Sequence, residues 1–369
     1  MAYSSFLEAK SIGYNTGMEK TMSFGDDMKN KIIKCVFASA LSVVILSGCA
    51  PVSQNADPEK KTLDSLTKAD DGIYCMDFYA DYKVDEYLKA NITDVTRLDT
   101  WLTGNLTHGV PTGDIPDMGC SSFAVNETSG DHLFARNYDM DPGESLIIRT
   151  VPANGYASVG IVDLSYVNLG SHGDYDINDE EAKSLLLAAP WCICDGINEK
   201  GLGISLLDVN DPHEVENTSK DDLLIYSSLR VILDKCASVD EAIDIYNSFD
   251  MYSPRHHSYN VFITDSSGRS VVVEWADGKT YVIEDTAITN FQLCQDKSSL
   301  DADQRYAKIH KKIDGVASMT SEEAMGVLKF VSRDTRWSAV YDLEKFSVEI
   351  CFNGDYSKSY TFEGIRSGG

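Results

Sequence analysis

The spacing of apolar residues predicts several helices, most of them in the second half of the chain. Along residues 222–235 apolar positions recur every three or four residues, the period of one helix face. Ser238 and Thr320 are each followed three residues later by Glu, the capping-box pattern of a helix start. Residues 304–313 are also expected to be helical, as is a mixed segment nearer the N-terminus, 84–98.

Short turns between β-prone runs predict hairpins on both sides of these helices. Ser129-Gly130-Asp131 separates two such runs, and a turn at 265–268 separates two more. The paired runs are 120–128 with 132–138, 259–264 with 270–275, and a closing pair, 337–341 with 346–352. One further strand is expected over 201–207. Hairpins, helix pairs and hairpins again indicate an α+β protein with layered sheets, without the regular alternation of a doubly wound fold.

A basic segment followed by an apolar one lies near the start of the chain. Residues 28–34 carry three lysines, residues 35–45 are apolar or small, and Leu46-Ser47-Gly48-Cys49 follows. The apolar run is shorter than the roughly 20 residues that a membrane-spanning helix needs. The pattern is typical of a bacterial lipoprotein signal peptide over 28–48, with lipidation at Cys49. A buried helix is the alternative, but it would not require the cationic prefix.

These signals divide the rest of the chain. Residues 1–27 are interpreted as an upstream mis-start, and 49–70 are polar and predicted to be a flexible tether. Residues 71–119 form a separate N-terminal segment that ends in a loop rich in Gly, Pro and Asp over 109–117, an exposed composition where a chain can be cut. The catalytic domain is expected over 120–369.

Composition excludes some functions. The 369 residues are 43% hydrophobic, as in globular proteins, and the formal net charge is −26. Nucleic-acid binding requires clustered Lys and Arg, which this balance does not provide. An acidic, solvated surface suits an exported protein that stays soluble next to the membrane to which it is anchored.

Seven cysteines follow the lipidation site Cys49, and an odd number leaves at least one thiol unpaired in an exported protein. Cys192 and Cys194 have apolar neighbours and no second Cys pair, so they do not fit a zinc site and are expected to be buried thiols. No metal or organic cofactor is expected.

Cys120 has the best sequence context for chemistry. A thiol attacks amides as thiolate and needs a nearby base, because its usual pKa is near 8.5. A nucleophile at a chain's own N-terminus carries an α-amine with a pKa near 8, within reach of its side chain. The predicted hairpin brings Arg136 and Asp139 back beside Cys120. A dyad with His256 or His257 is the alternative source of a base.

Several motifs follow one another along the chain: Cys120 with GDHLFARNYD, DGINEKGLGISLL at 195–207, DSSGRSVVVEW at 265–275, ITNF at 288–291 and TRWSAVYDLEKFSVEICF at 335–352. In this order they resemble the choloylglycine hydrolase family of N-terminal-nucleophile enzymes. That family includes bile salt hydrolases and penicillin V acylases, and its relatives include acid ceramidase, N-acylethanolamine acid amidase and penicillin acyltransferases. The resemblance covers about residues 119–352 and implies a four-layer αββα sandwich, with two antiparallel sheets between helical layers.

The resemblance also implies roles for residues of this chain. Cys120 would be the nucleophile, and its freed amine the general base. Arg136 would lie beside the thiol, and Asp139 would bind the amine. Arg305 would support the site electrostatically.

Two donors would stabilise the oxyanion of the tetrahedral intermediate. One is the side-chain amide of Asn290. The other is a backbone N–H that falls by alignment at Asp208, where relatives carry Asn or Tyr.

More than a hundred residues precede Cys120, so the ceramidase and acyltransferase branches are the better guide to maturation. Those enzymes cut themselves before the Cys into two chains that stay associated. Cleavage between Gly119 and Cys120 would leave pieces of about 49–119 and 120–369.

The expected function is hydrolysis of a linear, non-peptide amide by an outward-facing membrane lipoprotein, alone or as a homo-oligomer. Bile salts, N-acylethanolamines, N-acyl amino acids and penicillin V all remain open as substrates, since specificity depends on loops such as 165–190 and 208–221. Acyl transfer to an amine is one alternative, and a lipoprotein that only binds amphiphiles is another.

Overall fold

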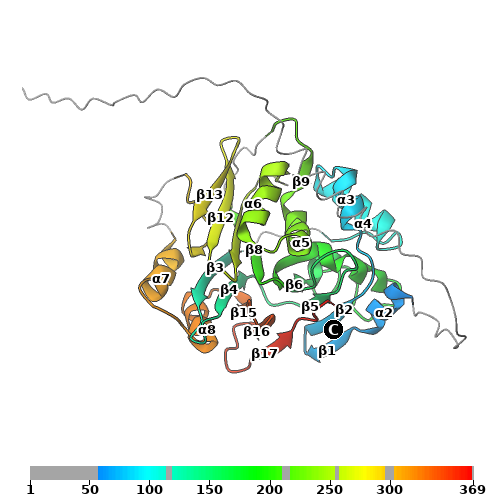
Figure 1. The fold of residues 1–369 in the computed structure, drawn as a ribbon. Coiled ribbons are helices and arrows are strands. Elements are labelled where there is room, and N and C mark those ends of the chain that lie inside the picture. Colours follow the sequence, from blue (N-terminus) through cyan, green and yellow to red (C-terminus); the bar gives the residue numbers. More distant parts are fainter. Residues whose placement is uncertain (1–56, 114–118, 210–216, 254–256, 296–302, 368–369) are drawn as a thin grey trace, which may run out of the picture. The chain divides into compact units, whose positions relative to one another are not determined.

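Two β-sheets, of nine and six strands, form the core of the computed structural model (Figure 1). The structure describes residues 57–113, 119–209, 217–253, 257–295 and 303–367. The predicted signal segment, the lipidation site Cys49 and residues 114–117 of the predicted cleavage loop lie outside these residues. Among the described residues, no helix is both long enough and apolar enough to cross a bilayer.

The nine-stranded sheet is antiparallel except at one pairing, where β2 and β5 run parallel. The parallel pair joins the segment before Cys120 to the segment after it. In spatial order the strands are β1 (Thr67–Asp70), β2 (Ile73–Phe78), β5 (Ser145–Thr150), β6 (Ser158–Asp163), β7 (Ile193–Asn198), β8 (Leu202–Val209), β11 (Ser258–Asp265), β12 (Ser270–Ala276) and β13 (Lys279–Glu284).

The six-stranded sheet carries Cys120 and is antiparallel throughout. Its centre is the predicted hairpin of β3 and β4, joined to the predicted closing hairpin of β15 and β16. In spatial order the strands are β14 (Ala287–Ile288), β3 (Gly119–Asn126), β4 (His132–Asp139), β15 (Thr335–Asp342), β16 (Ser347–Phe352) and β17 (Tyr360–Glu363).

Helices cover the outer faces of both sheets and complete four layers. Helices α5 (Ile225–Lys235) and α6 (Val239–Ser248) pack on β7, β8 and β11, and helices α7 (Gln304–Ile313) and α8 (Ser321–Val331) pack on β3, β4 and β15. Strands β3 and β8 face each other between the layers. The α+β architecture with two sheets between helical layers is therefore as predicted.

Two of the predicted helix starts show their caps. The Thr320 hydroxyl accepts from the Glu323 N–H while the Glu323 side chain accepts from the Thr320 N–H, a complete capping box. Ser238 also accepts from the Glu241 N–H, but the Glu241 carboxylate bonds to the Ala237 N–H instead of the cap residue's own. Short pieces β9 (Asp222–Leu224) and β10 (Asp250–Tyr252) pair in parallel beside α5 and α6.

The predicted tether is shorter than expected, because residues from 58 onward belong to the folded domain. Helix α2 (Pro58–Asp64) begins with Pro58 after the Asp57 cap, whose carboxylate accepts from Glu59 N–H. The Thr62 hydroxyl, fully buried, accepts from the N–H groups of Tyr79 and Ala80 and ties α2 to the chain after β2. The polar composition of this segment predicted a flexible chain and gave no sign of these contacts.

Two other expectations need correction. The mixed segment 84–98 is not one helix: α3 (Val84–Ala90) ends at Asn91, whose φ of 49° is left-handed, and α4 (Val95–Asn105) starts from the Asp94 cap. Part of the loop expected over 165–190 is regular structure, with short 3-10 helices η1 (Leu164–Val167) and η2 (Lys183–Cys192). The hydrophobic side chains of η2 are buried, so that segment is part of the core.

Candidate active site

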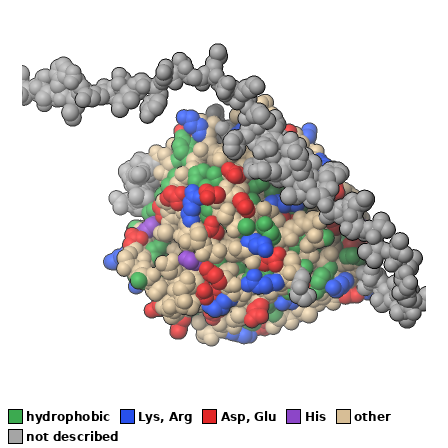
Figure 2. Space-filling view, viewed as in Figure 1, with side chains coloured by type: hydrophobic (Ala, Val, Ile, Leu, Met, Phe, Trp, Pro, Cys, Tyr) green, Lys and Arg blue, Asp and Glu red, His purple; other side chains and the backbone are tan. Residues whose placement is uncertain are grey.

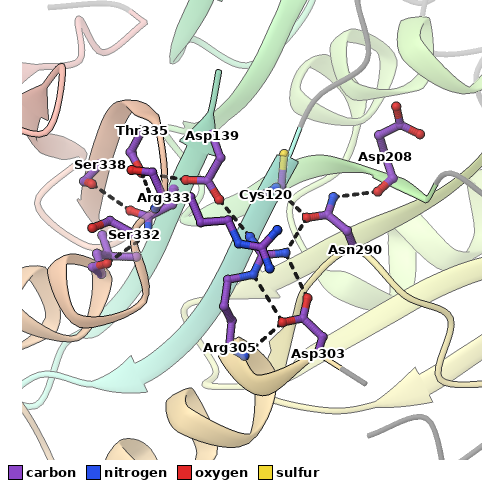
Figure 3. Close-up of polar contacts among 12 residues, drawn as sticks. Cys120, Asp139, Asp208, Asn290, Asp303, Arg305, Ser332, Arg333, Thr335 and Ser338 are labelled. Carbon is purple, nitrogen blue, oxygen red and sulfur yellow. Dashed lines mark hydrogen bonds and ion pairs between the residues drawn. The ribbon is translucent and has the colours of Figure 1, made fainter. Parts of the chain in front are cut away.

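Cys120 is the second residue of β3 and is fully buried. In the β3–β4 ladder it pairs with Tyr138, and Gly119 pairs with Asp139. The two residues of the predicted scissile bond therefore lie directly across from the strand that carries the family-like RN-x-D pattern. Figure 3 shows Cys120 with the polar side chains around it.

The backbone nitrogen of Cys120 has a side-chain partner. Its N–H donates to Asn290 Oδ1 at 2.6 Å, from the loop after β14 (Figure 3). The Asn290 amide nitrogen Nδ2 in turn donates to the backbone carbonyl of Asp208, also at 2.6 Å. One amide side chain thus links the nucleophile candidate on one sheet to the end of β8 on the other.

Arg305 connects Asn290 to Asp139 through two hydrogen bonds. From the first turn of α7 it donates Nη2 to Asn290 Oδ1 at 2.7 Å and Nη1 to Asp139 Oδ2 at 2.8 Å. Asp303, the N-cap of α7, accepts from Arg305 Nε at 3.2 Å and from Nη2 at 2.9 Å. The other oxygen of Asp139 accepts from the Thr335 hydroxyl at 2.6 Å. Both Asp139 and Arg305 are buried, so the network is held with little access to water.

Arg136 lies beneath the thiol, between the two sheets. It is fully buried, and its Nη2 donates to the Leu206 carbonyl at 2.6 Å while Nε faces Asp195 Oδ2 at 3.4 Å. Asp195 also accepts from the Trp337 indole at 3.1 Å and from the Tyr341 hydroxyl. The Asp195 carboxylate therefore holds the guanidinium in one orientation.

Burial raises the pKa of the Cys120 thiol to about 12, and the Arg136 guanidinium opposes that rise. Burial also raises the pKa of Asp195, with Arg136 again acting in the opposite direction. At neutral pH the thiol is protonated in this uncut chain. A base near the sulfur is needed before Cys120 can act as a nucleophile.

The structure brings the predicted catalytic residues, Asp208 and the Gly119–Cys120 bond together, with one difference in their contacts. Asp139, expected to bind the amine of Cys120, instead bonds to Arg305 and Thr335 while Cys120 is still joined to Gly119. The Cys120 nitrogen is held by Asn290, which was expected to serve the oxyanion. The role assigned to each residue stays a prediction.

The alternative base, a histidine, has other contacts. His257 Nδ1 lies 3.3 Å from Asp208 Oδ1, where β8 ends and β11 begins. His256 lies outside the described residues. The backbone carbonyl of Asp208 therefore contacts Asn290 of the candidate site, whereas the Asp208 carboxylate contacts the His257 ring.

Three contributors were absent from the sequence prediction: Asp195, Asp303 and Thr335. Asp303 had a local signal, because an Asp two residues before Arg305 stands where a helix cap would be expected. Asp195 and Thr335 lie at the edges of motifs that the sequence showed. Their spacing does not reveal that Asp195 pairs with Arg136 or that Thr335 donates to Asp139.

In the described part of the chain, all seven cysteines have free thiols, six of them buried, including Cys192 and Cys194 as expected. The same residues contain no group of three or more His, Cys, Asp or Glu side chains arranged to hold a metal ion.

The fold is a four-layer sandwich, with the buried Cys120 at the start of a central strand of the six-stranded sheet. The model of the acyl-coenzyme A:6-aminopenicillanic acid acyl-transferase family matches residues 186–355. Over that stretch, which is less than half of the chain, the sequence is similar to this acyl-transferase family. The matched region includes Asn290 and Arg305 and starts after Cys120.

Two of the solved structures that align with this chain are hydrolases. A variant of the conjugated bile acid hydrolase from Clostridium perfringens aligns with a TM-score of 0.46 and 17% identity, covering 67% of this chain and 98% of its own. The penicillin V acylase from Agrobacterium tumefaciens aligns with a TM-score of 0.46 and 17% identity, covering 66% of this chain and 85% of its own.

Proposed function

We propose that the protein is an amidohydrolase that cleaves linear, non-peptide amides with Cys120 as its nucleophile. The observation that carries this proposal is the 2.6 Å hydrogen bond from the Cys120 nitrogen to Asn290 Oδ1. The Asn290 side chain accepts a hydrogen bond from the Cys120 nitrogen and is itself held by Arg305, which also binds Asp139. Such a network suits a nitrogen that acts as the base in catalysis.

The first step is maturation. The Cys120 sulfur adds to the Gly119 carbonyl carbon, the Gly119–Cys120 C–N bond breaks, and the nitrogen takes up a proton. Water then hydrolyses the resulting thioester, leaving a carboxylate on Gly119 and an amine on Cys120. Gly119 suits this step, because a Cβ there would lie 3.1 Å from the Asp139 Cβ and crowd the strand pair.

The second step uses the new amine as the base that the thiol lacks. An α-amine has a usual pKa near 8 and takes the thiol proton, giving a thiolate next to Arg136. The thiolate attacks the substrate carbonyl, and the ammonium then protonates the leaving amine. Water releases the acyl group. No step requires a cofactor.

The oxyanion formed in that attack needs hydrogen-bond donors. We assign Asn290 Nδ2 and the backbone at Asp208 to this role, and their 2.6 Å contact would hold both in a fixed position. In the uncut chain one hydrogen of this amide is donated to the Asp208 carbonyl. One such donor typically contributes about 3 kcal/mol to transition-state binding.

The test compares the full chain with its Cys120→Ala variant. The parent should run as two fragments on a denaturing gel, and N-terminal sequencing of the larger fragment should begin at Cys120. It should also hydrolyse a member of one of four amide classes: conjugated bile salts, N-acylethanolamines, N-acyl amino acids or penicillin V. An active parent with an intact Gly119–Cys120 bond would refute the mechanism.

Acyl transfer is the second candidate, favoured by the acyltransferase family model that matches residues 186–355. Product analysis with and without an amine acceptor distinguishes the two reactions, since transfer gives a new amide and hydrolysis gives a free acid. A protein that only binds amphiphiles would stay as one chain, and Cys120→Ala would change none of its properties.

We also propose that the mature protein is an outward-facing bacterial lipoprotein anchored at Cys49. The support is the basic, then apolar, then Leu-Ser-Gly-Cys order of residues 28–49. Labelling cells with a radioactive fatty acid should mark the parent and leave a Cys49→Ser variant unlabelled. Equal labelling of both would contradict the anchor site.

A further inference from the structure

The outer faces of α7 and α8 carry a group of exposed cations. Five side chains form it with an exposed aromatic ring, and we call these residues the cationic patch: Lys308, Lys311, Lys312, Lys329, Arg333 and Phe330. Among the described residues, none of the five cations has a carboxylate within 4.0 Å, in contrast to Arg269 or Lys345 elsewhere on the surface. In a protein with 58 acidic and 32 basic residues, such a group of unneutralised cations is unexpected.

Phe330 is the apolar centre of the patch. It is 54% exposed, the largest exposed fraction among the described large hydrophobic residues. The ammonium groups of Lys308 and Lys312 lie 5.8 and 5.2 Å from its ring centroid, one helical turn apart on α7. A cavity of about 290 Å³ opens beside the ring and is lined by Lys308 and Arg333. An exposed ring costs free energy in water, so it suits a surface that is covered at times.

The arrangement fits an extended anionic surface. Lys308 and Lys312 lie on one face of α7. Lys329 lies in the last turn of the adjacent helix α8, with its ammonium 5.4 Å from the Tyr356 ring centroid, and Arg333 follows two residues after the helix end at Val331. Two ammonium groups beside an exposed phenyl ring suit a bilayer that contains anionic lipid, since lysines contact the headgroups while the ring enters the interface. The five cations are spread over two helices and do not converge on one point, as the site of a small ion would require.

The acidic remainder of the molecule does not prevent such binding. Figure 2 shows Asp and Glu side chains distributed over the visible face of the protein. Charges farther away than the Debye length, about 8 Å at physiological salt, are largely screened from a surface in contact with the patch. The acids closest in sequence are Asp314, which pairs with His310, and Asp334 after Arg333.

We propose that the cationic patch docks the protein on the anionic surface of a lipid bilayer. The proposal does not depend on the amidase activity. If that activity holds, docking has a consequence, because α7 carries both the patch and Arg305 of the candidate site. The enzyme would then work beside a bilayer in which amphiphilic amides dissolve.

The test is sedimentation with vesicles, using the full chain with Cys49→Ser so that no lipid is attached. One set of vesicles is pure phosphatidylcholine, and the other contains equal parts of phosphatidylcholine and phosphatidylglycerol. Binding should be stronger to the anionic set and should weaken as salt is added. Each Lys near an anionic surface contributes about 1 kcal/mol, a factor of about five, so Lys308→Gln with Lys312→Gln should weaken binding about 25-fold.

The matched control is Lys89→Gln with Lys279→Gln, two exposed lysines on α3 and β13 with the same loss of charge. This control should bind as the parent does. The apolar segment 35–45 is present in every variant and contributes equally. The proposal is overturned if the two pairs of variants bind alike, or if the parent does not distinguish the two vesicle sets. Circular dichroism of both double variants verifies that each is folded.

Discussion

At the scale of single residues, the site depends on charges enclosed between two sheets. Cys120 has a raised pKa because it is buried, and Arg136 is the neighbour that lowers it most. Arg136 is in turn paired with Asp195, and both side chains are inaccessible to water. Removing one member of such a pair leaves an uncompensated charge, which typically costs about 3–5 kcal/mol. A test of Arg136 must therefore keep the local charge balanced.

The double variant Arg136→Met with Asp195→Asn removes both charges and should remain folded. It should also lose the stabilisation that Arg136 gives to the thiolate, so we expect kcat/KM to fall about 100-fold or more. Asp195→Asn alone keeps the cation beside the thiol, so its kcat/KM should fall about tenfold or less, although the unpaired Arg136 should lower its melting temperature. If the double variant retained the activity of the single one, the assigned role of Arg136 would be wrong. Thermal melting of both variants provides the folding control.

A second prediction at this scale concerns maturation. A side chain at Gly119 would approach the Asp139 Cβ, and Asp139 is fixed by Arg305 and Thr335. Gly119→Val should slow the appearance of the two fragments at least about tenfold, the effect of about 1.4 kcal/mol in the barrier. Gly104→Ala on α4 is the control, since a Cβ there meets nothing within 4 Å. Equal cleavage rates in the two variants would contradict the close packing at Gly119.

At the scale of elements, α7 connects the site to the loop that carries Asn290. Its inner face presents Arg305, and five residues later His310 forms an ion pair with Asp285, which lies 3.2 Å away and just before β14. Asn290 follows β14 directly, so this pair anchors the strand from which the Asn290 loop departs. The hydrogen bond that the protonated His310 ring donates to Asp285 raises the pKa of His310 above its usual value of 6.5.

This pair predicts a pH-dependent stability. Because the folded-state pKa of His310 is raised, its contribution is fully present below about pH 6.5 and is lost as pH rises through the folded pKa. His310→Gln should therefore lower the free energy of unfolding by about 1 kcal/mol at about pH 5.5 and by much less at about pH 8.5. Urea unfolding of the parent and the variant at both pH values measures the difference. A loss that is equal at both values would contradict the assignment.

The elements also show which parts of the fold a sequence can predict. Hairpins such as β3–β4 and β11–β12 were predictable because a polar turn interrupts two β-prone runs. Strands β5 and β6 were missed, because central strands buried on both faces lack the alternation of apolar and polar residues. In the site, resemblance identified Asn290 and Arg305, but not Asp195, whose partners come from β4 and β15.

At the scale of the whole molecule, cleavage before Cys120 would divide one folded domain into two chains. The shorter piece would contain β1 and β2 of the nine-stranded sheet, and β2 pairs with β5 from Ile73–Ser145 to Phe78–Thr150. The Trp191 indole also donates to the Tyr82 carbonyl at 2.8 Å, and its ring lies 4.2 Å from that of Tyr87. The interface between the pieces is therefore part of the core.

It follows that the two pieces should remain associated after the cut. They should co-elute in gel filtration and separate only in denaturant, near the concentration at which the whole domain unfolds, because losing β2 would expose the edge of β5. Trp191→Ala should release the shorter piece at a clearly lower urea concentration, since truncating a buried Trp costs about 3–5 kcal/mol. Tyr252→Ala, at a side chain that is 36% exposed, should behave as the parent does. A matured enzyme that kept its activity after losing the shorter piece would show that β1 and β2 are dispensable, and the site would then depend on the six-stranded sheet and its helices alone.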